Sequence, residues 1–218
     1  MEMLIQARSK LVIIGDSITD CDRSRPVGEG QFGALGNGYV SLVDALIQAT
    51  APSQCIRVVN MGEDGNTVRN LKARWQRDVL DLSPDWLSIL IGINDVWRQF
   101  DSPFQSDWGV PLDEYETTLQ ALIEQVQPQL KGLVLMTPYF IEPNLKDEMR
   151  MRMDQYSTVV RGLAQKYSAL LVDTQLAFDR AMRHIHPAAL SKDRIHPNLP
   201  GHMIIARSFL SAIGYRWE

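Results

Sequence analysis

Residues 10–20 read KLVIIGDSITD, an apolar run that stops at a glycine and is followed at once by Asp16 and Ser17. The unbroken apolar stretch at 11–14 favours a β-strand that is covered on both faces, because an exposed face would bring alternating polar residues. A serine after a strand most often caps a turn or the next helix through its hydroxyl. The stretch therefore predicts a buried strand and leaves two roles open for Ser17, a cap or a reactive group.

Further apolar runs of similar length follow along the chain, and each is typical of a strand in a parallel sheet. They lie at 56–60, 86–91, 133–137 and 169–173. Between these runs, apolar residues recur three and four positions apart, which is the spacing of one face of a helix. The expected helices include 112–126, 149–167, 174–184 and 200–213, the last with Pro200 in its first turn.

Strand and helix patterns alternate along the chain without an internal repeat, a low-complexity tract or a linker. This alternation predicts a single α/β domain over residues 1–218, with a three-layer α/β/α architecture. We expect a five-stranded parallel sheet in the flavodoxin-like order 2-1-3-4-5. Ligands of such sheets bind beyond the carboxyl ends of the strands, so functional residues should follow the strands directly.

Charge and composition limit the classes of partner and the cellular compartment that fit this chain. The net charge is −4, whereas nucleic acid or an anionic membrane surface would favour a basic face. No apolar run approaches the ~20 residues of a membrane span. The two cysteines, Cys21 and Cys55, predict no disulfide framework and fit a reducing compartment. We therefore expect a cytoplasmic protein that binds neither nucleic acid nor a membrane.

Polar residues and glycines follow the expected strands where a site would lie. Ser17 follows the first strand, Gly65 lies in NMGEDGNT after the second, and Asn94 lies in GIND after the third. Asp193 and His196 stand three positions apart in DRIH, just before the last helix. The predicted sheet would bring all these groups to one edge.

These residue types match the needs of a serine hydrolase, which requires a nucleophile, a base, a carboxylate that orients the base, and donors for an oxyanion. Ser17 would attack a carbonyl while His196 takes its proton, and Asp193 would fix the tautomer of the imidazole. The backbone N–H groups of Ser17 and Gly65 and the amide of Asn94 would form the oxyanion hole.

The chain resembles the SGNH, or GDSL-type, esterases and acylhydrolases. Four blocks occur in the order of that family: GDS, the glycine block NMGEDGNT, GIND and DRIH. The resemblance implies a Ser17–His196–Asp193 triad and no metal or organic cofactor. One departure concerns Glu63 and Asp64, which stand where the family commonly has small or apolar residues. A carboxylate that faced the oxyanion would oppose its charge, so we expect both to point away.

Longer stretches, among them CDRSRPVGEGQFGALGNGYV, LMTPYFIEPN and DRIHPNLPGHM, are similar to the bacterial intracellular acetylxylan esterases. That resemblance implies removal of acetyl groups from small xylan-derived sugars through an acyl-enzyme intermediate. Two alternatives remain. One is a general GDSL acylhydrolase, lipase-like or thioesterase-like, that acts on another small acyl ester. The other is a flavodoxin-like ligand-binding protein without catalysis, which a flavin spectrum would reveal.

Three further patterns extend beyond the four blocks. Trp97 lies three residues after Asn94 and is expected to contact substrate, whereas the other aromatic residues up to position 115 predict an interface of a homo-oligomer or a lid. These are Phe100, Phe104, Trp108 and Tyr115. GEGQFG at 28–33 matches a dinucleotide motif only formally, because it starts well after the strand. The four histidines are expected to bind no metal.

Overall fold

Strand β1 (Lys10–Gly15) lies inside an all-parallel sheet of five strands in the order β2-β1-β3-β4-β5. The other strands are β2 (Arg57–Gly62), β3 (Trp86–Leu90), β4 (Gly132–Met136) and β5 (Leu170–Val172). The computed structural model describes residues 3–101 and 109–216. The predicted strand order is confirmed, and each strand lies within two residues of its predicted bounds.

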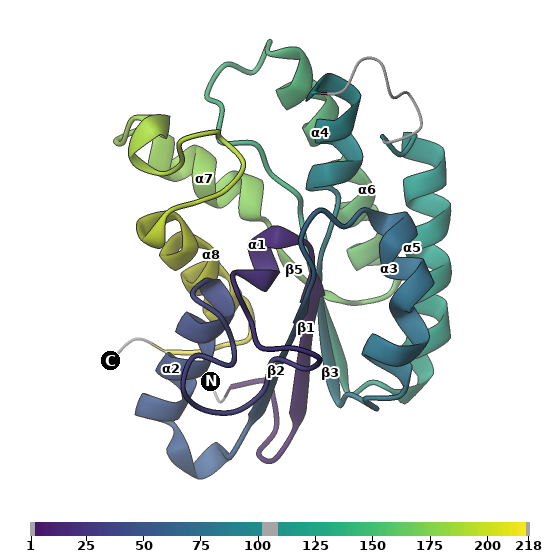
Figure 1. The fold of residues 1–218 in the computed structure, drawn as a ribbon, viewed down its shortest axis with the longest axis vertical. Helices are drawn as coiled ribbons and strands as arrows, with labels where there is room; N and C mark the ends of the chain where they lie inside the picture. The colour runs from purple at the N-terminus through teal and green to yellow at the C-terminus, as the bar shows by residue number, and fades with distance from the viewer. Residues whose placement is uncertain (1–2, 102–108, 217–218) are drawn as a thin grey trace.

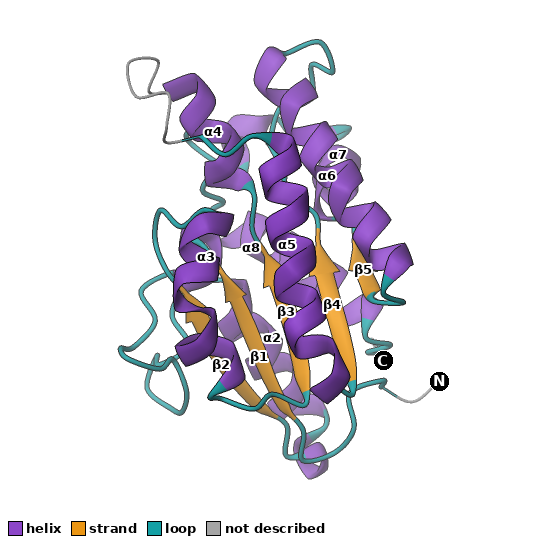
Figure 2. Ribbon diagram, turned by 90° about the vertical axis from the view of Figure 1, so that its right-hand side faces the viewer, coloured by secondary structure: helices purple, strands orange, loops and turns teal. Residues whose placement is uncertain are grey.

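Helices cover both faces of this sheet (Figures 1 and 2). Figure 2 shows α3, α5 and α6 in front of the strands, with α2 and α8 behind them. The helices are α1 (Ser17–Asp20), α2 (Tyr39–Thr50), α3 (Val68–Trp75), α4 (Ile93–Asp101), α5 (Leu112–Val126), α6 (Glu148–Lys166), α7 (Thr174–Met182) and α8 (Leu199–Ala212). Short turns of helix complete the description at η1 (Pro52–Gln54), η2 (Gln76–Leu80), η3 (Gln127–Gln129) and η4 (Pro187–Ala189).

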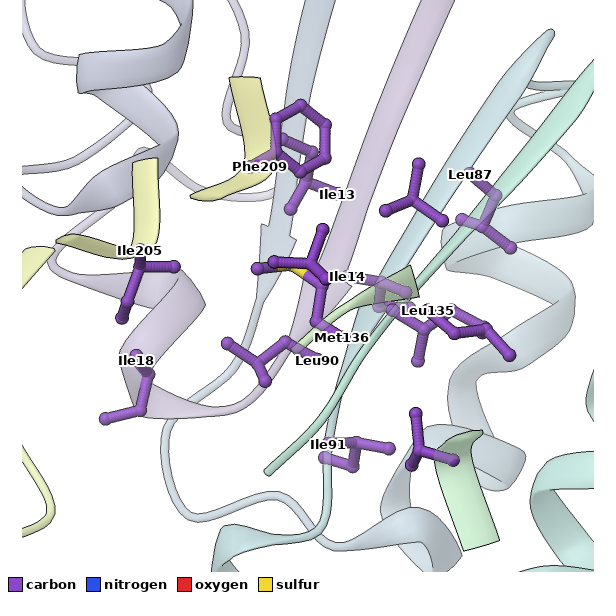
Figure 3. Packing of buried hydrophobic residues seen from close by; sticks show 14 of the residues in the cluster. Ile13, Ile14, Ile18, Leu87, Leu90, Ile91, Leu135, Met136, Ile205 and Phe209 are labelled. Atoms are coloured by element: carbon purple, nitrogen blue, oxygen red, sulfur yellow. The ribbon is translucent and has the colours of Figure 1, made fainter. Parts of the chain in front are cut away.

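The core explains why the strand sequences do not alternate. Successive side chains of a strand point to opposite faces of the sheet, yet every residue from Leu11 to Ile14 is fully buried. Both faces of β1 therefore need a cover of helices. Figure 3 shows Ile13 and Ile14 gathered with side chains of the neighbouring strands and with Phe209 of α8.

The strand register aligns the carboxyl ends of the sheet. Gly15 is paired with Gly62 on one side and with Leu90 on the other, and Leu90 is paired with Met136. Residues that follow β1, β2, β3 and β4 therefore start from one row. This row is the edge at which the sequence predicted the site.

No helix in the part of the chain that the structure describes is long and apolar enough to cross a membrane. Two aromatic residues that the sequence assigned to an interface or a lid, Phe104 and Trp108, lie outside the described residues. Tyr115 corrects that assignment, because it is fully buried in the apolar stripe of α5 and its hydroxyl donates to the carbonyl of Ile91 at 2.9 Å.

Candidate active site

Ser17 lies two residues after the end of β1 and is the first residue of α1. The turn is capped by Asp16, whose Oδ1 accepts a hydrogen bond from the N–H of Ile18 at 3.0 Å. The chain is tightly packed here, since a Cβ on Gly15 would lie only 2.4 Å from the carbonyl oxygen of Leu90. The sequence Gly-Asp-Ser thus fixes the point at which the serine leaves the sheet.

Asp193 and His196 lie on the loop before α8, and this loop reaches Ser17. The Oγ of Ser17 lies 3.0 Å from Nε2 of His196. On the other side of the ring, Nδ1 of His196 lies 2.6 Å from Oδ2 of Asp193. Both are hydrogen-bond distances, so the structure brings the three predicted side chains into one hydrogen-bonded series.

Hydrogen bonds within its own loop keep Asp193 charged. Burial alone would raise its pKa, but hydrogen bonds from the His196 ring, from the N–H groups of His196 and Ile195, and from the Ser191 hydroxyl lower the pKa to about 2. Ser191 and the two N–H groups bond to Oδ1, whereas the ring bonds to Oδ2. A carboxylate at Nδ1 requires the ring proton there, so the lone pair of Nε2 faces Ser17.

The DRIH loop is held by residues that sequence reasoning missed. Arg194 adopts a left-handed backbone with φ 66°, and its carbonyl accepts a hydrogen bond from the N–H of Ile141 at 3.0 Å. Its guanidinium pairs with Glu142 and lies 4.9 Å from the ring centroid of Phe140. The spacing Asp-x-x-His indicates the reactive groups, but it carries no signal for the segment on which the loop rests.

The predicted oxyanion donors come from three loops at the same edge. Asn94 is buried, and its Nδ2 donates to the carbonyl of Asn66 at 3.0 Å. Gly65 has φ 70°, a conformation that favours glycine. Within the described residues, the backbone N–H groups of Ser17 and Gly65 have no hydrogen-bond partner. Both donors are therefore free to bind an acceptor.

Glu63 and Asp64 differ in where they lie. Glu63 reaches Arg74, with its Oε2 3.5 Å from Nε of the guanidinium. Asp64 is exposed and lines the same cavity as Ser17. The carboxylate of Glu63 therefore lies against a cation. That the carboxylate of Asp64 points away from the oxyanion stays a prediction.

A cavity of about 320 Å³ opens beside Ser17. Its walls include Ile18, Asp64, His196 and His202. A second cavity, of about 570 Å³, lies between β5, α7 and α8 and shares no lining residue with the first. The smaller cavity is the one that meets the hydrogen-bonded serine and histidine.

Trp97 packs against the histidine of this series. Its ring meets the ring of His196 edge-on, with centroids 5.9 Å apart and an interplanar angle of 73°. The guanidinium of Arg98 lies 4.9 Å from the Trp97 ring centroid. Phe100, farther along α4, is exposed. Trp97 thus stands beside the site, as a substrate contact requires.

Cys21 and His202 form a neutral pair on the cavity wall. Burial, followed by the nearby charges of Asp20 and Asp22, raises the pKa of the Cys21 thiol to about 12. Burial lowers the pKa of His202 to about 4. The Nδ1 of His202 accepts the N–H of Tyr39 at 3.2 Å, and its Nε2 lies 3.4 Å from the Cys21 sulfur. The thiol stays protonated and unreactive at neutral pH.

The glycine-rich stretch at 28–33 lies along β2, away from any strand–helix turn. Gly28 forms an antiparallel bridge with Asn60, and Glu29 pairs with Arg57 at 2.8 Å. This position does not suit a dinucleotide phosphate, which needs the N-terminus of a following helix. Among residues 3–101 and 109–216, no group of three or more histidine, cysteine, aspartate or glutamate side chains could hold a metal ion.

A parallel α/β/α sheet with a hydrogen-bonded serine, histidine and aspartate at its carboxyl edge is an arrangement that hydrolases use. The chain belongs to the GDSL-like lipase/acylhydrolase family, whose model matches residues 13–204.

Relatives of known structure agree with this assignment. An acetylxylan esterase from Geobacillus stearothermophilus is 56% identical over 215 residues, which cover 99% of this chain and 98% of that protein. Its crystal structure superposes with a TM-score of 0.98 over 99% of this chain and 98% of that one. An α/β hydrolase enzyme from the metagenome of Lake Arreo, Spain, is 54% identical, with a TM-score of 0.97 and full coverage of both chains.

Proposed function

We propose that this protein is a serine carbohydrate esterase that removes acetyl groups from acetylated xylo-oligosaccharides. The observation that carries the proposal is the hydrogen-bonded series from Ser17 through His196 to Asp193. The acetyl substrate rests on the 56% identity with an acetylxylan esterase over 99% of the chain.

The reaction would begin at the hydroxyl of Ser17. Its Oγ attacks the acetyl carbonyl while the proton passes to Nε2 of His196, 3.0 Å away. The imidazolium formed is stabilised by the carboxylate of Asp193. Collapse of the tetrahedral intermediate breaks the ester bond, and His196 returns its proton to the sugar oxygen. Water then attacks the acetyl-serine by the same route, which releases acetate and restores the Ser17 hydroxyl.

The negative oxygen of each intermediate needs preorganised donors. The N–H groups of Ser17 and Gly65 lack partners among the described residues, which supports their assignment to the oxyanion hole. The Nδ2 of Asn94 carries two protons, of which one is used by the carbonyl of Asn66. Its second proton is the third donor of the proposed hole.

The test is the replacement Ser17→Ala, assayed with a chromogenic acetate ester and with acetylated xylo-oligosaccharides. We expect kcat to fall by roughly 10⁴-fold or more, because the nucleophile is absent. The thermal midpoint should stay near that of the wild type. Turnover at the wild-type rate would refute the mechanism, and a wild type that prefers long acyl chains would favour the general acylhydrolase instead.

Three further statements belong to the proposal. The enzyme acts in the cytoplasm, residues 1–218 form a single catalytic domain, and Trp97 contacts the sugar. The position of Trp97 against His196 supports the last of these. A homo-oligomer built through the aromatic segment stays a prediction, which light scattering of the purified protein checks.

A further inference from the structure

Arg74 is a buried arginine beneath the candidate site, on the last turn of α3. Only 7% of the residue is exposed, so its guanidinium has left water almost completely. A buried arginine needs partners for its donors, because the charge is never lost at ordinary pH. The partners of Arg74 distinguish it from an arginine that only forms a structural ion pair.

Three of its hydrogen bonds end on the segments that carry the oxyanion donors. Nη2 donates to the carbonyl of Gly15 at 2.8 Å, and Nη1 donates to the carbonyl of Met61 at 2.7 Å. Nε donates to Oδ1 of Asn66 at 2.7 Å. Gly15 ends β1 two residues before Ser17, whereas Met61 and Asn66 flank the loop that contains Gly65.

The third donor is tied to the same group through Asn66. The carbonyl of Asn66 accepts the bond from Nδ2 of Asn94, while its side chain accepts the bond from Arg74. The planar guanidinium, with donors in a fixed fork, therefore sets the relative positions of the ends of two strands and of one side-chain amide.

We propose that Arg74 is the positioning residue of the oxyanion hole. It holds Gly15, Met61 and Asn66 at fixed spacing, so that the donors on Ser17, Gly65 and Asn94 converge on one oxygen. This inference rests on the proposed function, since it concerns the same reaction. It assigns the precision of the hole to a helix residue that touches neither substrate nor triad.

The primary test is Arg74→Lys, which keeps the charge but replaces the fork by a single ammonium. We expect kcat for acetate esters to fall by roughly 10- to 100-fold, because misplaced donors weaken transition-state binding. KM should change by less than about threefold, since the donors act on the transition state. Affinity for a boronic acid, which forms a tetrahedral anionic adduct on serine, should fall by a factor similar to that of kcat.

Asp78→Asn is the matched control. Asp78 is fully buried and accepts from Nη1 of Arg74 at 2.7 Å, but it lies on neither of the segments that carry Ser17 and Gly65. Removal of its charge should lower the urea midpoint and leave kcat within about twofold of the wild type, because the other acceptors of Arg74 remain. If Asp78→Asn lowers kcat as much as Arg74→Lys, Arg74 only stabilises the fold and the inference is wrong.

Asn66→Ala covers the case in which Arg74→Lys does not fold. It removes one acceptor of Arg74 in a loop and keeps the carbonyl that bonds to Asn94. We expect a fall in kcat of roughly tenfold at unchanged KM. Where Arg74→Lys folds, the double variant Arg74→Lys/Asn66→Ala should show no lower kcat than Arg74→Lys alone. Both substitutions break the same link between Arg74 and Asn66, so their effects should not add.

The outcomes separate this inference from the proposed function. Wild-type kcat in folded Arg74→Lys, or in Asn66→Ala, overturns the inference even when Ser17→Ala is inactive. Wild-type turnover in Ser17→Ala overturns the proposed function itself, and with it the idea of an oxyanion hole at this place.

Discussion

An amide at position 193 would have nearly the size of the native carboxylate, but it would move the ring proton of His196 from one nitrogen to the other. Oδ1 of Asp193 accepts from Ser191 and from two backbone N–H groups, whereas Oδ2 accepts from the ring. An amide can satisfy the three donors only with its oxygen, which turns its NH₂ group towards Nδ1. The ring would then carry its proton on Nε2, where it cannot accept from Ser17.

We therefore expect Asp193→Asn to lower kcat by roughly 10³- to 10⁴-fold with little change in KM. Steady-state assays with an acetate ester, beside the thermal midpoint of the variant, measure the effect. A folded Asp193→Asn protein that keeps its kcat would show that the carboxylate has no part in catalysis.

At the scale of elements, the site depends on how closely β2 approaches α1. A Cβ on Gly62, the last residue of β2, would lie 2.1 Å from the backbone nitrogen of Asp20. The strand end and the helix that starts at Ser17 must therefore separate if position 62 carries any side chain. Gly162 offers the opposite case, because it lies on an exposed face of α6 with nothing within 4 Å of an added Cβ.

Gly62→Ala should destabilise the protein by about 1–3 kcal/mol and lower activity, because overpacking shifts the segment that holds the serine. Gly162→Ala should raise the free energy of unfolding by about 0.5–1 kcal/mol and leave activity unchanged. Alanine has fewer backbone conformations than glycine in the unfolded chain, so less conformational entropy is lost when the helix forms. Urea unfolding of both variants, with ester hydrolysis at one temperature, checks the pair. Equal stability of the two variants would contradict the close approach of β2 to α1.

Elements differ in how well the sequence predicts them. The run at 11–14 and its counterparts are apolar without alternation, and that property is local, so the buried strands could be predicted. The pattern does not fix the strand order, which was predicted from the usual order of the flavodoxin-like fold and is confirmed. The grouping of Ser17, Asp193 and His196 could also be predicted, because the three residue types follow expected strands or precede the last helix. Tyr115 was misassigned, since an aromatic residue near loops can equally lie on the buried stripe of a helix.

The structural roles of Arg74 and Arg194 could not be predicted, because a charged residue in a sequence ordinarily indicates an exposed position. Beside its partner Asp78, Arg74 is buried against acceptors on the ends of β1 and β2 and on Asn66. Arg194 takes a positive φ in a loop that rests on residues of the β4–α6 segment. The contacts of Arg74 with Gly15 and of Arg194 with Ile141 join residues far apart in sequence, and no local pattern encodes them.

At the scale of the whole molecule, acid stability depends on His202, which joins three helices. It belongs to α8, accepts from the first N–H of α2 and contacts Cys21 at the end of α1. Burial lowers its pKa from 6.5 to about 4, so the unfolded chain binds a proton that the folded chain does not. Its contribution to stability is complete above pH 6.5 and is lost as the pH falls towards 4.

We expect His202→Asn, which keeps an oxygen for the N–H of Tyr39, to remove that pH dependence. The wild type should lose on the order of 3 kcal/mol relative to the variant between pH 6.5 and 4. Burial raises the pKa of Asp16 and Asp95 to about 7, so these carboxyls act in the opposite direction over the same range. The contribution of His202 is therefore read from the difference in urea midpoint between wild type and variant at each pH. A difference that stays constant between pH 6.5 and 4 would contradict the role of His202.

The hydrogen bond between Ser17 and His196 joins residues 179 positions apart. During synthesis Ser17 leaves the ribosome long before His196, so the nucleophile has no base until the chain has been made past residue 196. A nascent or prematurely terminated chain therefore holds a serine that no base activates, and hydrolysis begins only after the final helix region has been made and docked. Catalytic activity in this architecture therefore requires that the chain has been made past His196 and that the loop carrying His196 has docked against α1.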